Sequence, residues 1–275
     1  MKDVRLFDKA FTTASASISD PNINIVPKYI HWLRKGELTD PTFFADYYIS
    51  QVINYLSFGN CMAWLLEPRG LRPEHYKITK KLKDYFKFIF TFDREFLDNV
   101  KNARFYPMGG CRIAYEHWGI HPKKHNLSII ASYKNQLEGH KLRHEIIEKF
   151  GYAFDGIYGA GKNYIRSKYN GLALFRYSVV IESCREDYYF TEKLIDSLLV
   201  GTIPIYWGCP SINKFFDMNG ILYFNTIEEF YSILSYIGEL DYQARLESIK
   251  NNFKIAGKYA VAEDWIYENY RELFE

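Results

Sequence analysis

The 275-residue sequence has no apolar run of the ~20 residues that cross a lipid bilayer, and residues 1–19 lack the apolar core of a secretion signal. The net charge is only +2, which does not favour nucleic acid or an anionic membrane as a partner. Four widely spaced cysteines without a Cys-x-x-Cys pair argue against a zinc site and a disulfide framework. We therefore expect a cytoplasmic protein with no transmembrane segment, while a peripheral place at the inner membrane stays open.

The composition allows a large buried interior, since 48% of the residues are hydrophobic and 18% are aromatic. For this length we expect two domains. Short apolar runs alternate with stretches of helical periodicity, which predicts an α/β fold with a doubly wound sheet in each half. We expect strands at 4–7, 61–66, 86–91, 104–107, 127–131, 153–158, 178–181, 202–207 and 221–224, and helices at 42–58, 73–85, 94–100, 139–150, 163–175, 226–237, 241–253 and 261–273.

The alternation breaks at Gly109-Gly110, and residues 111–125 show no clear period. We therefore predict an amino-terminal Rossmann-like domain at 1–122 and a carboxyl-terminal one at 123–275. Residues 1–40 carry little pattern beyond a short strand and a turn at Asp20-Pro21.

Residues 177–217 hold the densest set of signals. A strand of buried type ends at Ile181, a polar turn follows, and Thr191 is placed to cap a helix with an apolar face. Gly201 ends that helix before a second buried strand. Ligands of open parallel sheets bind outside the carboxyl ends of the strands, so we expect the polar turn to line a ligand site. Its candidate residues are Glu182, Ser183, Tyr189, Glu192 and Lys193.

This stretch resembles the α1,3/4-fucosyltransferases of glycosyltransferase family 10. In that family a strand is followed by Glu-Asn-Ser, then by Tyr-x-Thr-Glu-Lys-Leu and Ile-Pro-Ile-Tyr-Trp-Gly. The resemblance is strong over residues 127–217 and implies the GT-B architecture, two Rossmann-like doubly wound domains facing across a cleft. Ser183 departs from the pattern, because the family has asparagine there. The matching residues are Glu182-Ser183, Tyr189, Thr191-Glu192-Lys193-Leu194, Ile203-Pro204-Ile205-Tyr206-Trp207-Gly208 and Pro210.

The resemblance implies an enzyme that transfers L-fucose from GDP-fucose to a glycan hydroxyl with inversion. Departure of the nucleotide requires its growing negative charge to be neutralised. The resemblance assigns Lys193 and Arg143 to the donor phosphates, Glu192 to the donor hydroxyls, and Tyr189 and Ser183 to the border of the nucleotide.

Two further positions follow from the resemblance. Tyr158 matches the tyrosine of an Asp-x-Tyr-Gly turn in the donor domain. Glu67 stands at the end of an expected buried strand, and Glu67-Pro68 resembles the segment that supplies the family's general base. An equally open reading is that Glu67 only binds backbone amides of the next loop.

Metal-dependent readings find less support in the sequence. No Asp-x-Asp follows a strand, which counts against the GT-A class of glycosyltransferases, so we expect no cofactor and no obligatory metal. His117, His121 and His125 are four residues apart, but Pro122 makes one straight helix unfavourable there, and surface histidines are the better account. Residues 156–163 approach a P-loop, yet they lack the Ser or Thr that would hold magnesium.

Three other functions stay open. Ser183 leaves room for a different nucleotide-sugar donor on the same fold. A non-catalytic glycan- or nucleotide-binding protein would keep the donor pocket and need no base, and a P-loop phosphohydrolase would use the turn at 156–163. The expected partners are a nucleotide sugar and a glycan, for which the lipopolysaccharide O-chain is one candidate.

Overall fold

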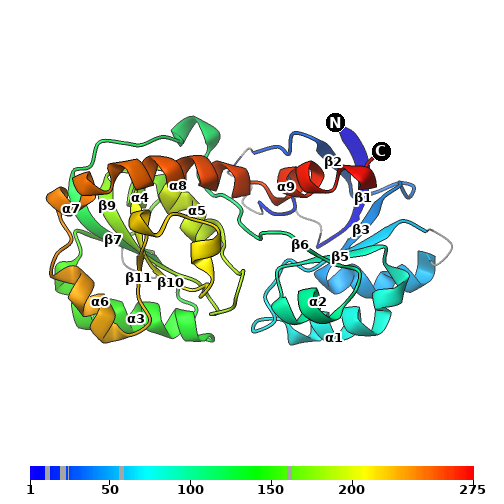
Figure 1. The fold of residues 1–275 in the computed structure, drawn as a ribbon, viewed down its shortest axis with the longest axis horizontal. Helices are drawn as coiled ribbons and strands as arrows, with labels where there is room; N and C mark the ends of the chain where they lie inside the picture. Colours follow the sequence, from blue (N-terminus) through cyan, green and yellow to red (C-terminus); the bar gives the residue numbers. More distant parts are fainter. Residues whose placement is uncertain (10–12, 19–22, 24, 56–58, 160–162) are drawn as a thin grey trace. The chain divides into compact units, whose positions relative to one another are not determined.

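The computed structural model describes residues 1–9, 13–18, 23, 25–55, 59–159 and 163–275 (Figure 1). They form two compact units. The first contains Met1–Gly110, Glu186–Tyr189 and Val261–Glu275, and the second contains Cys111–Arg185 and Phe190–Ala260. No helix in these described ranges is both long and apolar enough to cross a membrane.

The first unit is built on a six-stranded sheet in the order β2-β1-β3-β4-β5-β6, with every neighbouring pair parallel. All residues of β3 and β4 are buried, as in an inner parallel strand covered on both faces. The strands are β1 Lys2–Phe7, β2 Ile30–Leu33, β3 Thr42–Ala45, β4 Cys61–Trp64, β5 Phe88–Thr91 and β6 Ala103–Phe105. The helices are α1 Pro73–Leu82, α2 Arg94–Asn99 and α9 Ala262–Asn269, with 3-10 turns η1 Asp46–Tyr55, η2 Lys83–Tyr85 and η7 Arg271–Leu273.

The second unit holds a five-stranded parallel sheet in the order β11-β10-β9-β7-β8. In Figure 1, α3 and α6 lie below this sheet and α4, α5 and α8 lie above it. The strands are β7 His125–Ala131, β8 Gly156–Gly159, β9 Phe175–Ile181, β10 Ile203–Trp207 and β11 Leu222–Tyr223. The helices are α3 Glu138–Phe150, α4 Lys168–Leu172, α5 Glu192–Leu199, α6 Ile227–Leu234, α7 Glu239–Ala244 and α8 Leu246–Tyr259, with 3-10 turns η3 Tyr115–His117, η4 Gly151–Ala153, η5 Ile212–Lys214 and η6 Met218–Gly220.

Both sheets place their second strand beside the first and add later strands on the other side. The strand order therefore reverses between β1 and β3 in the first unit and between β7 and β9 in the second. Ligands of doubly wound sheets bind at such a reversal, outside the carboxyl ends of the strands. The predicted α/β class with two doubly wound parallel sheets is confirmed.

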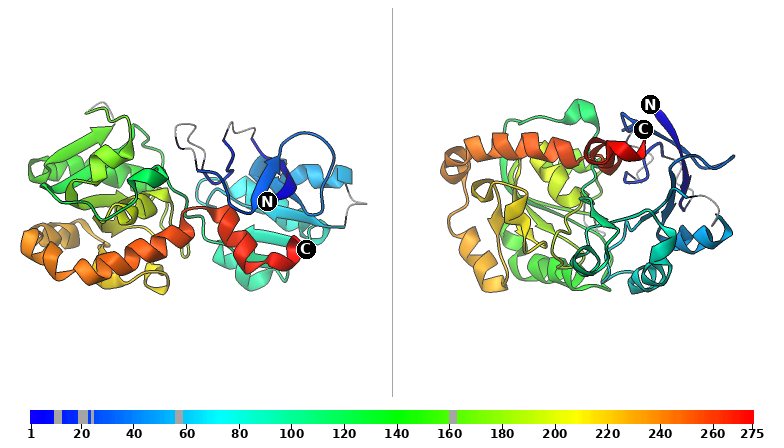
Figure 2. Two further views of the ribbon diagram at one scale, coloured as in Figure 1. Left: turned by 90° about the horizontal axis from the view of Figure 1, so that it is seen from above. Right: turned by 45° about the vertical axis from the view of Figure 1, so that its right-hand side comes forward.

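The helix α9 belongs to the first unit and lies beside β2 (Figures 1 and 2). Its Glu263 is fully buried and accepts hydrogen bonds from the Ser15 hydroxyl at 2.8 Å, the Ala16 amide at 2.6 Å and the Trp32 indole at 3.2 Å. A buried carboxylate needs such donors. Because α9 belongs to the first unit, the units differ from the predicted domains 1–122 and 123–275, which placed α9 in the second domain.

The segment after Gly110 also lies with the second unit, earlier than the predicted boundary at residue 122. The Arg112 amide donates to Asp196 at 2.6 Å, and the Gly119 amide donates to the Leu199 carbonyl at 2.9 Å. Both partners lie on α5, so these hydrogen bonds fix the segment to the second unit.

The predicted helix at 42–58 is correct only in part. Its first residues form β3, Asp46–Tyr55 forms the 3-10 helix η1, and residues 56–58 lie outside the described ranges. Phe43 and Phe44 are fully buried in a strand that pairs on both sides, so their aromatic spacing reflects a buried sheet. Asp46 has a φ of 43°, in the left-handed region, which separates the strand from the turn.

Two more expectations need correction. The predicted helix at 163–175 is reduced to α4, because Tyr158 and Asn163 form a β-bridge and Phe175 already begins β9. The strand β2 was not predicted. The turn expected at Asp20-Pro21 lies outside the described residues.

Candidate functional site

Glu182 anchors the start of α5 to the end of β9. It is the first residue after β9 and is fully buried. Its carboxylate accepts hydrogen bonds from the Thr191 amide at 2.8 Å and the Thr191 hydroxyl at 2.7 Å. Thr191 is also the N-cap of α5, since its Oγ1 accepts from the Lys193 amide at 3.4 Å, as predicted. These hydrogen bonds tie the start of α5 to the end of β9 at the carboxyl end of the sheet.

Lys193 extends over this turn. Its Nζ donates to Thr191 Oγ1 at 2.8 Å and lies 3.3 Å from Glu182 Oε2 and 3.5 Å from Glu192 Oε1. The side chain is 28% exposed, so solvent and ligands still reach it. A lysine at this place adds its charge to the positive end of the helix dipole. The arrangement suits the binding of an anion.

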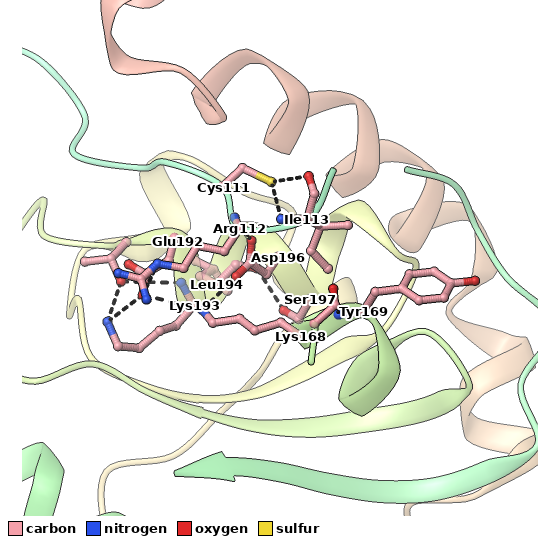
Figure 3. A network of polar contacts seen from close by, with 12 residues as sticks. Cys111, Arg112, Ile113, Lys168, Tyr169, Glu192, Lys193, Leu194, Asp196 and Ser197 are labelled. Carbon is pink, nitrogen blue, oxygen red and sulfur yellow. Dashed lines mark hydrogen bonds and ion pairs between the residues drawn. The ribbon is translucent and has the colours of Figure 1, made fainter. Parts of the chain in front are cut away.

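Glu192 is the meeting point of three cations, two of which the sequence did not reveal as site residues (Figure 3). Besides Lys193, its Oε1 lies 3.5 Å from Lys168 Nζ and 3.9 Å from Arg112 Nε. Lys168 Nζ also lies 2.7 Å from Oδ2 of Asp196, whose side chain is fully buried. No spacing in the sequence joins these positions, because they come from three separate segments.

Glu192 and the neighbouring Lys168 are held in their ionised forms. Burial by itself raises the pKa of Glu192, but Lys193, Lys168 and Arg112 hold that pKa well below its ordinary value. Burial lowers the pKa of Lys168, yet Asp196 and Glu192 outweigh it and raise that pKa overall. Glu192 and Lys168 are therefore both charged at neutral pH.

Two glycines allow the backbone to close around Glu182. A Cβ on Gly139, near the start of α3, would lie 1.8 Å from the Glu182 carbonyl oxygen. A Cβ on Gly208, just after β10, would lie 2.7 Å from Glu182 Cγ. Both separations are far below van der Waals contact, so only glycine fits at either position. The start of α3 therefore lies directly on the end of β9, where the strand order reverses.

Arg143, on α3, reaches the same strand end. Its side chain is buried, and its Nε and Nη2 donate to the Ile181 carbonyl at 3.1 and 2.5 Å. The structure thus brings Arg143 to the residue that precedes Glu182. Its predicted contact with donor phosphates stays a prediction.

The remaining predicted donor residues lie at different places. Ser183 follows Glu182, and its carbonyl accepts from the Gly139 amide at 3.3 Å. Tyr158 is on β8, with its ring 6.0 Å from that of Phe175. Tyr189 belongs to the first unit, where its ring is 5.2 Å from that of Phe92 and only 4% of the residue is exposed.

The segment 156–163, whose sequence approaches a P-loop, lies partly outside the described residues, since 160–162 are not among them. In the described ranges no three His, Cys, Asp or Glu side chains gather as metal ligands. His117 and His121 both contact the Tyr169 ring, at centroid distances of 4.5 and 5.2 Å. The expectation that no metal is needed stays a prediction.

Glu67, the candidate base, lies in the first unit on a firmly held turn after β4. Its own side chain is exposed. The Glu67 carbonyl accepts from the Tyr76 hydroxyl at 2.8 Å, the Leu66 amide donates to Asp46 Oδ1 at 2.9 Å, and the Leu65 carbonyl accepts from the Tyr106 hydroxyl at 2.7 Å. Three consecutive residues are thus fixed by side chains, which presents Glu67 at the carboxyl end of the sheet.

The chain resembles known proteins in part of its sequence and in its fold. No protein-family model matches it. A segment of 73 residues, 26% of the chain, is 32% identical to the α-(1,3)-fucosyltransferase FucT of Helicobacter pylori and spans only 15% of that relative. The resemblance indicated by the 177–217 motif is confirmed to that extent.

Solved structures share the fold over most of the chain. A crystal structure of α1,3-fucosyltransferase with GDP matches with a TM-score of 0.59 at 14% identity, over 96% of this chain and 92% of that one. The fold is GT-B. An E. coli trehalose-6-phosphate synthase bound with UDP-2-fluoro glucose matches with a TM-score of 0.60 at 10% identity, over 86% and 74% of the two chains. The predicted GT-B class is confirmed, and at these identities the likeness extends to the fold alone.

Proposed function

We propose that this protein is an inverting glycosyltransferase that moves L-fucose from GDP-fucose to a glycan hydroxyl. The observation that carries the proposal is the Glu182–Thr191–Lys193 arrangement at the carboxyl end of β9, formed by the motif that resembles family 10. The 32% identity to a fucosyltransferase over 73 residues supports the same donor.

The second unit would bind the donor. Lys193 is partly exposed and stands at the start of α5, where backbone amides also favour an anion, so it suits the pyrophosphate. Glu192 would accept hydrogen bonds from the sugar hydroxyls, because an ionised carboxylate has several acceptor sites. Arg143 adds a fixed positive charge at the same strand end.

The first unit would supply the base. Glu67 takes the proton of the acceptor hydroxyl while that oxygen forms a bond to the anomeric carbon of fucose. The bond from this carbon to the phosphate oxygen breaks, and GDP leaves with the electron pair. Attack from the face opposite the leaving group inverts the anomeric centre. The glycan acceptor, with the lipopolysaccharide O-chain as a candidate, is part of the proposal.

Calorimetry with GDP, GDP-fucose, GDP-mannose, UDP and ATP tests the donor, first without metal and then with magnesium. The proposal expects GDP and GDP-fucose to bind without metal. Binding of ATP only with magnesium would contradict it and favour a phosphohydrolase. A transfer assay over a glycan panel then separates an enzyme from a protein that binds the donor without turnover.

A second donor has specific support. Ser183 replaces the amide that family 10 enzymes carry, and a protein bound with UDP-2-fluoro glucose shares the fold. Preference for UDP over GDP in the same calorimetry would retain the glycosyltransferase and replace its donor.

A further inference from the structure

Lys168 connects two carboxylates that have different surroundings. Glu192 and Asp196 lie four residues apart on α5 and therefore share one face of the helix. Lys168 opens α4 directly after its N-cap Ser167, and its Nζ lies 2.7 Å from Asp196 and 3.5 Å from Glu192 (Figure 3). This one ammonium group therefore bridges α4 to both carboxylates of α5.

Asp196 keeps Lys168 in its place. The Asp196 side chain is fully buried, and its other oxygen accepts from the Arg112 amide at 2.6 Å. If Lys168 moved away, a buried carboxylate would lose its cation, which is strongly unfavourable. The ammonium group is thus fixed by a partner that no ligand can reach.

Lys193 cannot serve Glu192 in the same way. It is shared with Glu182 and Thr191, and it is the lysine that the proposed function gives to the donor phosphates. A phosphate bound to Lys193 would compete with Glu192 for that charge. Arg112 is 42% exposed, and its Nε is 3.9 Å from the Glu192 carboxylate, beyond hydrogen-bond distance.

We propose that Lys168 is a positioning residue that holds the Glu192 carboxylate in place for the hydroxyls of the donor sugar. The inference rests on the proposed function and deepens it, because it divides the cluster into two roles. Lys193 serves the phosphates, whereas Lys168, fixed by Asp196, serves the sugar side through Glu192.

These two roles predict that loss of Lys168 weakens the binding of GDP-fucose but not that of GDP. Lys168→Met should weaken GDP-fucose binding about tenfold, the size expected for a charged hydrogen bond. GDP carries no fucose and should bind within about twofold of wild type. Arg112→Gln keeps the backbone bond to Asp196 and should have a smaller effect than Lys168→Met. Lys149→Met is the matched control, since Lys149 is an exposed lysine paired with Glu145 on α3.

Lys168→Met leaves Asp196 without its cation and can fail to fold. The double variant Lys168→Met/Asp196→Asn removes both charges, and the amide oxygen still accepts from the Arg112 backbone. The double variant should show the same selective loss of GDP-fucose affinity. Folding of each variant is checked by circular dichroism and thermal unfolding.

The pH dependence of donor binding gives a second readout. Without Lys168 the Glu192 carboxyl loses a cation, so the acid limb of GDP-fucose binding should shift to higher pH while that of GDP stays. Among the described residues, the charged groups that act on Glu192 are Lys193 and Asp196 on its own helix, Lys168 on α4 and Arg112 before η3, and Lys193 also pairs with Glu182.

Three results would contradict either the inference on Lys168 or the proposed donor. A folded double variant with wild-type GDP-fucose affinity overturns the inference. An equal loss of GDP and GDP-fucose affinity also overturns it, because Lys168 would then serve the phosphates or the fold. A wild-type protein that binds GDP but not GDP-fucose contradicts the proposed donor instead.

Discussion

The two units share a strand order, yet the carboxyl ends of their strands carry different chemistry. In the first unit, Asp46 follows β3, Glu67 follows β4 and Asp93 comes soon after β5, with Arg69 bound to Asp93 at 2.8 Å. In the second, three cations surround Glu192 at the start of α5. The same strand order thus carries an exposed carboxylate in the first unit and a carboxylate paired with cations in the second. The loops that follow the strands, and not the strands themselves, determine this difference.

A large effect should come from removing the ammonium group of Lys193, which lies over the turn after β9 in the second unit. Lys193→Ala should lower the transfer rate by about 10²–10³-fold, as for loss of a preorganised charge at a leaving group, and should weaken GDP binding measured by calorimetry. Glu182 keeps its two hydrogen bonds from Thr191, so the variant should fold. Full transfer by folded Lys193→Ala protein would contradict the contrast between the units. Lys149→Ala controls for loss of a surface lysine.

Loss of the candidate base in the first unit should affect the transfer rate and leave GDP binding unchanged. Glu67→Gln should lower transfer by about 10²–10⁴-fold, the usual contribution of a general base, while GDP affinity stays at the wild-type value. Glu74→Gln, at an exposed glutamate on the nearby helix α1, is the matched control. If Glu67→Gln transfers normally, the exposed carboxylate has no part in proton transfer and only shapes its loop.

A smaller effect concerns the turn that presents Glu67. Asp46→Ala removes the acceptor for the Leu66 amide and puts alanine at a φ of 43°, so the free energy of unfolding should fall by about 2 kcal/mol. Asp46→Asn keeps an acceptor and tolerates this φ, so it should stay within about 1 kcal/mol of wild type. Thermal unfolding of both variants measures the difference. Equal destabilisation by the two changes would show that the charge of Asp46 matters more than its hydrogen bond.

An effect of similar size distinguishes buried carboxyl groups by their dependence on pH. Burial raises the pKa of Asp264, in the first unit, to about 6, whereas an unfolded aspartate has a pKa of about 3.9. The folded state therefore binds more protons between these values, and the stabilisation present at low pH is lost as pH rises through 6. Asp264→Asn can still accept from the Lys28 amide, so it should match wild type near pH 4 and be more stable near pH 7, by about 2 kcal/mol.

For Asp241 of the second unit, the expected change of stability with pH has the opposite sign. Burial acts to raise its pKa, but hydrogen bonds from Arg245 and Tyr177 lower it overall. Its stabilisation is present above the unfolded pKa and is lost as pH falls. Asp241→Asn should therefore cost stability at pH 7 and little at pH 3. The same dependence of unfolding free energy on pH for both variants, measured in urea, would remove the distinction between a carboxyl whose pKa is raised by burial and one whose pKa is lowered by hydrogen bonds.

The parts predicted correctly from sequence are those whose signals are local. The cap at Thr191, the end of its helix at Gly201, with a φ of 68°, and the buried strand that follows all depend on neighbouring residues. The strand β3 was mistaken for helix because a short, fully buried aromatic run carries no alternation.

The cluster around Glu192 could not be predicted in full. Lys168, Asp196 and Arg112 meet only because α4, α5 and the segment before η3 pack together. Each is unremarkable in its own stretch of sequence. Likewise, nothing local shows that Glu263 belongs with Ser15, because 248 residues separate them.

The bond between Glu263 and the 15–17 segment has a consequence for how the protein is made. On the ribosome, the strands of the first sheet emerge early, but α9 is synthesised only after the whole second unit. Until then the hydroxyl and amide groups of Ser15, Ala16 and Ser17 have no carboxylate to bind. Domains of nascent chains usually fold in order of synthesis. Here the order is reversed: the second unit can close first, and the first is completed last.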